Sequence, residues 1–141
     1  MKKLNKKKKG FTLIELVIVL AVLAIIALIA IPNFTKVRND SLIKADKRTG
    51  EQIKKITLMA IANENIKVPT PSSQASEVEI KFPNDTLTIT GGIYDNGSSD
   101  YATMLKEINA PQVNGEESYK VKIDVGGNVT VYYGTGATLS E

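Results

Sequence analysis

One stretch near the N-terminus decides the fold of this chain: KKKKGFTLIELVIVLAVLAIIALIAIPNF, at residues 6–34. Four consecutive lysines lead to Gly10, and every side chain from Leu16 to Ile31 is apolar. A helix of residues 11–31 would be about 30 Å long, which is enough to cross the hydrocarbon core of a bilayer. We therefore expect residues 11–33 to form a membrane-spanning helix, with the lysines on its cytoplasmic side.

Glu15 is the only ionisable residue within residues 11–31. A carboxylate at the centre of a membrane helix costs about 2.5–3.5 kcal/mol on insertion scales, and less near the interface. Ionisable groups inside membranes usually have a partner and a function. The sequence therefore predicts a cationic or hydrogen-bonding partner for Glu15.

Two general kinds of N-terminal segment share parts of this pattern. A secretory signal peptide has a basic start, but its apolar region is shorter and ends in an A-x-A-like cleavage site. Here the alanines recur at every third position instead, at Ala21, Ala24, Ala27 and Ala30. A plain single-span anchor explains everything except Glu15, whose carboxylate would then have to reach the lipid headgroups.

The sequence KGFTLIE at residues 9–15, followed by the uninterrupted apolar segment, resembles the N-terminus of type IV pilins and pseudopilins. In that family a prepilin peptidase cleaves after the glycine, on the cytoplasmic side of the membrane, and methylates the new N-terminal amine. The resemblance implies cleavage between Gly10 and Phe11 and N-methylation of Phe11. It also implies that Glu15 faces the N-terminal amine of a neighbouring subunit during assembly.

Pro32 matches a proline that this family often carries, and we expect it to kink the helix, because helical patterning resumes after it. In the alternative, Pro32 ends the membrane span.

The resemblance also implies a function and partners. The chain would be a precursor in the cytoplasmic (inner) membrane, with its N-terminus in the cytoplasm, and would then self-associate into a helical filament at the cell surface. Assembly would require an assembly platform and an ATPase. A pseudopilin of a type II secretion or DNA-uptake system, or a minor pilin, is an alternative within the family. An alternative of another class is a membrane-anchored extracytoplasmic binding domain.

Composition excludes several classes of function. The 141 residues include no cysteine and no histidine, so disulfides, thiolate metal sites and Ser-His-Asp triads are excluded. We expect no enzymatic activity, no cofactor and no metal site; residues 95–100 lack the spacing of a calcium loop. Residues 1–10 hold six lysines and no acidic residue, against 12 basic and 15 acidic residues in the remainder. The basic patch is thus a topology signal, and direct nucleic-acid binding is not expected.

Residues 34–66 have the pattern of an amphipathic helix. We expect Ile53, Ile56, Met59, Ala60 and Asn63 to lie along its packed face. Gly50 would weaken the helix unless it allows curvature or close packing. A continuous helix from residue 11 to residue 65 is predicted; the alternative is a break at residues 39–41, with Asp40 as the cap of a second helix.

The pattern of residues 67–141 predicts a loop followed by a small antiparallel sheet. The expected fold class is therefore α+β, with a long N-terminal helix packed on the sheet. Residues 68–77 are expected to be loop, residues 78–82 and 87–90 strands, and residues 118–125 and 129–133 a hairpin around a turn at 126–128. A short helix at residues 101–108 would be capped by Asp100, with Leu105 and Ile108 inward. The tail, residues 134–141, is predicted to be mobile. Most of the five tyrosines are expected to be half-buried strand residues. The five are Tyr94, Tyr101, Tyr119, Tyr132 and Tyr133.

Overall fold

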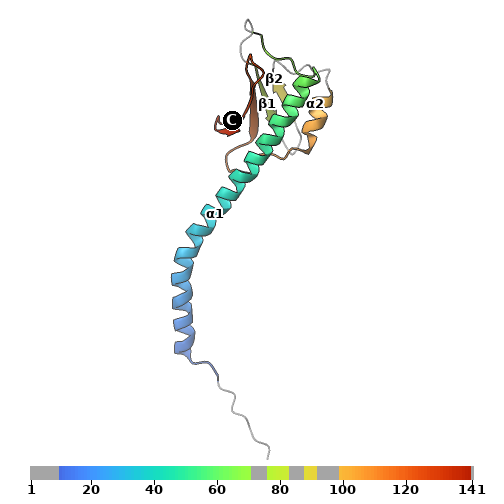
Figure 1. Cartoon of the computed structure of the whole chain (residues 1–141). Helices are drawn as coiled ribbons and strands as arrows, with labels where there is room; N and C mark the ends of the chain where they lie inside the picture. Colours follow the sequence, from blue (N-terminus) through green and yellow to red (C-terminus); the bar gives the residue numbers. More distant parts are fainter. Residues whose placement is uncertain (1–9, 71–75, 83–87, 92–98, 141) are drawn as a thin grey trace, which may run out of the picture. The chain divides into compact units, whose positions relative to one another are not determined.

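The computed structural model describes residues 10–70, 76–82, 88–91 and 99–140. A single long helix, α1 (Leu13–Ala62), leads into an antiparallel sheet (Figure 1). The chain divides into two compact units, Met1–Arg38 and Asn39–Glu141, and α1 begins in the first and ends in the second. The predicted α+β class is confirmed.

Helix α1 is continuous over 50 residues. The alternative of two helices broken at residues 39–41 is therefore wrong. The helix also runs through Pro32, which lacks the N–H that would bond to the preceding turn. The hydroxyl of Thr35 donates to the carbonyl oxygen of Pro32 at 2.9 Å, a back-bond that often accompanies bending. The kink at Pro32 itself stays a prediction.

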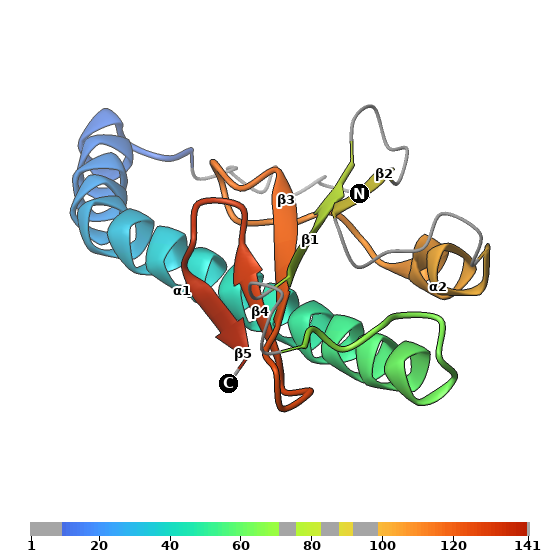
Figure 2. The same ribbon diagram turned by 90° about the horizontal axis from the view of Figure 1, so that it is seen from above.

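The sheet has five strands, and every pair is antiparallel: β1 (Ser76–Lys81), β2 (Thr88–Gly91), β3 (Ser118–Ile123), β4 (Val129–Tyr133) and β5 (Thr138–Ser140). Their order in space is β2-β1-β3-β4-β5 (Figure 2). The predicted β3–β4 hairpin is confirmed, with Val121 opposite Val131. Its turn is closed by Asp124, whose Oδ1 accepts hydrogen bonds from the N–H groups of Gly126 and Asn128, both at 2.8 Å.

The core lies between the sheet and the second half of α1. Inward residues of β1, β3 and β4 pack on Ile53 and Ala60 of α1, and Tyr101, Leu105 and Ile108 close one end. The inward positions predicted for Leu105 and Ile108 are confirmed. The core strand residues are Val78, Ile80, Tyr119, Val121, Ile123, Val129, Val131 and Tyr133.

The buried face of α1 differs from the predicted stripe. It consists of Asp46, Gly50, Ile53, Thr57 and Ala60. Met59 is 59% exposed and Asn63 is exposed, so their assignment to the packed face is wrong; Ile56 is partly buried. The reason is that two polar residues occupy packed positions. Thr57 satisfies its hydroxyl with the carbonyl oxygen of Ile53 at 2.8 Å and the hydroxyl of Tyr101 at 3.0 Å.

Three further predictions are corrected by the structure. The predicted helix at 101–108 is α2 (Ser99–Met104) followed by a 3-10 turn (Leu105–Glu107), and Asp100 lies in its first turn and is not the cap. Strand β1 begins at Ser76, inside the predicted loop. Three tyrosines are buried rather than half-buried: Tyr101 and Tyr119 are fully buried, and Tyr133 is 6% exposed. Tyr94, Leu87 and residues 95–98 of the calcium-like loop lie outside the described residues.

Residues 134–140 of the C-terminal tail are ordered, contrary to the mobility predicted for residues 134–141, of which Glu141 lies outside the described residues. Thr138–Ser140 form β5, which pairs with β4, and Leu139 is buried. Leu139 packs directly on Gly50: a Cβ atom at Gly50 would lie 3.0 Å from the Cβ of Leu139. The glycine therefore permits the close approach of helix and strand.

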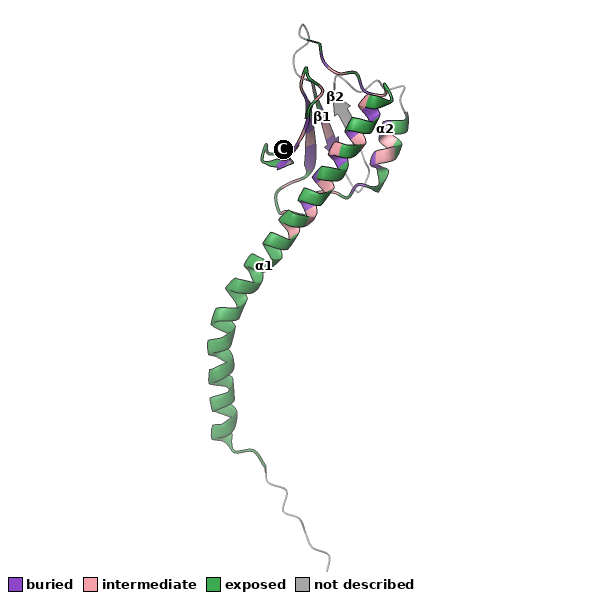
Figure 3. Cartoon of the chain, in the orientation of Figure 1, coloured by how far each residue is buried: buried purple, intermediate pink, exposed green. Residues whose placement is uncertain are grey.

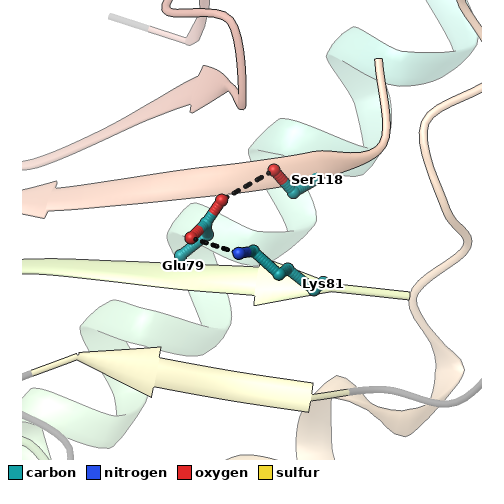
Figure 4. Close-up of polar contacts among 3 residues, drawn as sticks. All are labelled: Glu79, Lys81 and Ser118. Atoms are coloured by element: carbon teal, nitrogen blue, oxygen red, sulfur yellow. Dashed lines mark hydrogen bonds and ion pairs between the residues drawn. The ribbon is translucent and has the colours of Figure 1, made fainter. Parts of the chain in front are cut away.

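The solvent-facing side of the sheet carries charge pairs. The Nζ of Lys81 lies 3.1 Å from Glu79 Oε2, and the hydroxyl of Ser118 donates to Glu79 Oε1 at 3.1 Å (Figure 4). Burial acts to raise the pKa of Glu79, but the hydrogen bonds from Lys81 and Ser118 and the charges of Lys81 and Lys120 hold the pKa below its ordinary value. The ion pair of Glu79 and Lys81 lies within β1, whereas Lys120 of β3 lies directly opposite Glu79. Opposite charges facing one another across neighbouring strands favour this register.

Asp46 joins α1 to the rest of the second unit, Asn39–Glu141, which we call the head. It is 1% exposed, and its carboxylate accepts hydrogen bonds from the N–H of Gln112 at 2.9 Å, the N–H of Val113 at 3.0 Å and the hydroxyl of Tyr133 at 3.1 Å. The ring of Tyr133 stacks on Tyr119, with centroids 6.3 Å apart. A buried carboxylate is tolerated when it is hydrogen-bonded in this way.

We predict that Asp46→Ala lowers the free energy of unfolding by about 2–4 kcal/mol. The three lost hydrogen bonds to a charged group contribute about 1.5–3 kcal/mol each, and part of this is offset because the cost of burying the carboxylate is also removed. Urea unfolding of the full-length chain in detergent, followed by tyrosine near-UV circular dichroism, measures this. Asp40→Ala is the matched control, since Asp40 is exposed on the same helix, and should change stability by less than about 0.5 kcal/mol. An equally small effect of Asp46→Ala would contradict the anchoring role.

Burial, the hydrogen bond to Asp46 and the negative charge of Asp46 raise the pKa of Tyr133 above its ordinary value. The folded protein thus keeps this proton at a pH where the unfolded chain releases it. The resulting stability is present below the ordinary tyrosine pKa of about 10 and is lost as the pH rises further. We expect the unfolding free energy of Tyr133→Phe to decline less steeply than that of the wild type between about pH 9 and 11. Equal slopes would show that Tyr133 titrates alike in both states.

Candidate functional site

The start of α1 is capped by its own side chains. The N–H and the hydroxyl of Thr12 donate to Glu15 Oε2 at 2.8 and 2.9 Å, and the N–H of Glu15 points back to the Thr12 hydroxyl at 3.4 Å. This reciprocal arrangement of threonine and a glutamate three residues later is a capping box, which satisfies N–H groups that the first helical turn leaves free.

Glu15 therefore has a partner within its own chain. Both strong hydrogen bonds use Oε2. Among the residues that the structure describes, no hydrogen bond reaches Oε1, and Glu15 is exposed. One oxygen of the carboxylate can thus hold the helix end while the other accepts a donor from outside.

Thr12 was not singled out by the sequence reasoning. The signal that could have found it is the pattern T-x-x-E directly before an apolar helix, at residues 12–15. The family resemblance drew attention to Glu15 as a charge, and its second role as a capping residue was overlooked.

Gly10 and Phe11 lie just before the helix, which begins at Leu13. Both are exposed, Phe11 by 93%, and no atom lies within 4 Å of the position that a Gly10 Cβ would occupy. The peptide bond between them is thus on non-helical, open backbone. The structure brings Phe11 and Glu15 together at one helix end, whereas Pro32 lies more than four turns further along α1.

Every residue of α1 from Leu13 to Ile31 is exposed (Figure 3), and all of these side chains except that of Glu15 are apolar. The large hydrophobic residues from Phe11, just before the helix, to Phe34 range from 49% exposed, at Val17, to 93% exposed, at Phe11. An 18-residue window of this helix has a mean hydropathy of 3.2 and is not buried at all, so α1 is long and apolar enough to cross a membrane. An exposed apolar surface of this extent requires lipid or protein cover.

These features together define a class: a pilin-like protein whose apolar N-terminal helix fits a membrane-anchored precursor. Comparison with known proteins agrees. Residues 5–31 match the family described as "Prokaryotic N-terminal methylation motif". The chain is 37% identical over 125 residues to "Prepilin peptidase-dependent protein A" of Clostridium perfringens, which covers 89% of this chain and 84% of the relative. No solved structure gave a significant match.

The chain belongs to the family of type IV pilins and pseudopilins. This is a family of structural proteins and not a known class of enzyme.

We predict that Thr12→Val frays the first turn of α1, because valine keeps the shape of threonine but cannot cap. Loss of an N-cap costs about 1 kcal/mol, so the Leu16 amide, which bonds to the Thr12 carbonyl oxygen, should exchange about fivefold faster. Hydrogen exchange in detergent micelles measures this. Thr12→Ser keeps the hydroxyl and should exchange like the wild type. If both variants match the wild type, the capping box has no energetic role.

Proposed function

We propose that this chain is the structural subunit of a type IV pilus-like filament that polymerises through the first half of α1. The observation that carries the proposal is the uncovered apolar helix with a carboxylate at its first turn. In the membrane, lipid would cover this helix. After assembly, the same surfaces of neighbouring copies would cover one another.

Processing comes first in this proposal. Prepilin peptidase would cut the exposed bond between Gly10 and Phe11 and methylate the Phe11 amine. The family match at residues 5–31 and the name of the Clostridium perfringens relative support this step. Removal of residues 1–10 would also take away six lysines, whose mutual repulsion would oppose close packing of N-termini in a filament.

Glu15 would then set the position of each subunit. Its carboxylate would pair with the cationic Phe11 amine of a neighbouring copy, inside an apolar environment where the attraction between charges is strong. Such a pair adds little net stability, but a subunit displaced along the filament would leave two charges unpaired, at a cost of about 3–5 kcal/mol for each broken pair. The pair would therefore define the axial register.

The other partners follow from this route. A platform in the cytoplasmic membrane and its ATPase would extract the mature subunit from the bilayer, and the filament would extend from the cell surface. The heads, residues 39–141, would form the outer layer of the filament. The domain organisation under this proposal is a cleaved leader at residues 1–10, a filament-core helix at 11–33, an amphipathic helix at 34–66 that packs on the head, and a loop with the C-terminal sheet of the head at 67–141.

We predict that Glu15→Gln inserts into the membrane and is processed normally but yields at least about a hundredfold fewer filaments, because an unpaired buried charge costs about 3–5 kcal/mol. Sheared filaments are quantified by immunoblot against total protein. Glutamine is also a capping-box residue, so this variant separates the charge from the cap.

Thr12→Val is the matched control, since it removes the cap and keeps the charge. Under the proposal it should assemble far better than Glu15→Gln. Wild-type filament yield from Glu15→Gln would contradict the proposed charge pair.

A further inference from the structure

A groove of about 730 Å³ lies between α1 and β5, the strand at one edge of the sheet. Its helical wall carries three lysines, one glutamate and one leucine, and Thr138 and Leu139 of β5 form the other wall; the helical residues are Lys47, Glu51, Lys54, Lys55 and Leu58. The groove is therefore basic. It also contains an accessible apolar side chain, because Leu58 is 42% exposed.

Charge is distributed unevenly over the head. Residues 39–55 carry five basic and three acidic residues, and one of the acidic residues, Asp46, is buried. Residues 56–141 carry five lysines against eleven acidic residues, a net charge of −6. The head thus has a basic helix segment and an otherwise acidic remainder, which makes one copy complementary to another.

The flank opposite the groove carries exposed acidic residues. Figures 1 and 2 place β5 on one side of α1 and α2 on the other. Asp100, in the first turn of α2, and Glu107, at the end of the following 3-10 turn, are both exposed, and one exposed lysine, Lys106, lies beside Glu107. A contact between opposite flanks of identical subunits is heterologous, and such contacts continue from copy to copy and generate helical filaments.

The lining of the groove favours a protein partner over an anionic polymer. No aromatic side chain lies among the residues that line it, whereas proteins that bind single-stranded nucleic acid stack bases on aromatic rings. The exposed Leu58 would gain from contact with apolar side chains, which a phosphate polymer does not offer.

We propose that the groove formed by α1 and β5 receives the acidic flank of α2 from a neighbouring copy, with Lys47 and Lys55 facing Asp100 and Glu107. The inference rests on the proposed filament function and adds a contact between heads to the contact between helices. Individually weak ion pairs are sufficient here, because polymerisation through α1 holds the heads at high effective concentration.

The test compares Lys47→Glu/Lys55→Glu with Lys44→Glu/Lys67→Glu, which makes the same change of charge on exposed residues outside the groove. Both variants should insert and be processed as the wild type. We expect the groove variant to yield about fivefold fewer sheared filaments, the effect of losing two exposed ion pairs. The control should match the wild type. Adding Asp100→Lys/Glu107→Lys to the groove variant should restore the yield.

Disulfide trapping gives a second readout, because the chain has no cysteine of its own. Lys55→Cys combined with Glu107→Cys should produce a ladder of cross-linked oligomers in oxidised filaments, and Lys55→Cys alone should not. Normal yield from the groove variant together with no ladder overturns the inference. Normal yield together with lost binding of filaments to double-stranded DNA also overturns it, in favour of a polyanion. If wild-type cells shed no filaments at all, the proposed function fails instead.

Discussion

The structure depends on one constraint: the first half of α1 is an apolar helix whose large side chains are exposed among the residues that the structure describes. Its large hydrophobic side chains are about half to almost fully exposed, and each square ångström of apolar surface left in water forgoes about 25 cal/mol. Under the proposed function, lipid would cover this helix in the precursor, and copies of the same helix would cover it in the filament. The second half of α1 buries only the face that meets the sheet, so one continuous helix serves both environments.

Much of this architecture could be predicted from local pattern. The length of the apolar run predicts the helix. The alternation of apolar and polar residues after residue 77 predicts strands, and the turn at residues 126–128 predicts the hairpin of β3 and β4. Asp46 and Thr57 could not be found in this way, because a search for apolar residues passes over them. Their partners, such as Gln112 and Tyr101, lie 66 and 44 residues away. Strand β5 was missed for a similar reason: a three-residue strand is ordered by pairing with β4 and by the space above Gly50, neither of which its own sequence encodes.

Thr12 and Glu15 show how one side chain can serve two successive states. In the isolated chain, Oε2 of Glu15 caps the helix, which lowers the cost of placing a carboxylate at the edge of a membrane span. The capped carboxylate is also pre-oriented at the helix end where cleavage would create a cationic amine. Under the proposed function the cap therefore protects the precursor and prepares the site of assembly, while the charge alone selects the register of the polymer.

Mass spectrometry of protein sheared from the surface of intact cells tests the central claim most directly. The account predicts a polypeptide that begins at Phe11, carries one methyl group on its N-terminal amine and lacks residues 1–10. A polypeptide that retains its lysine-rich N-terminus, or that is found only in the membrane fraction and never among the sheared material, would contradict it.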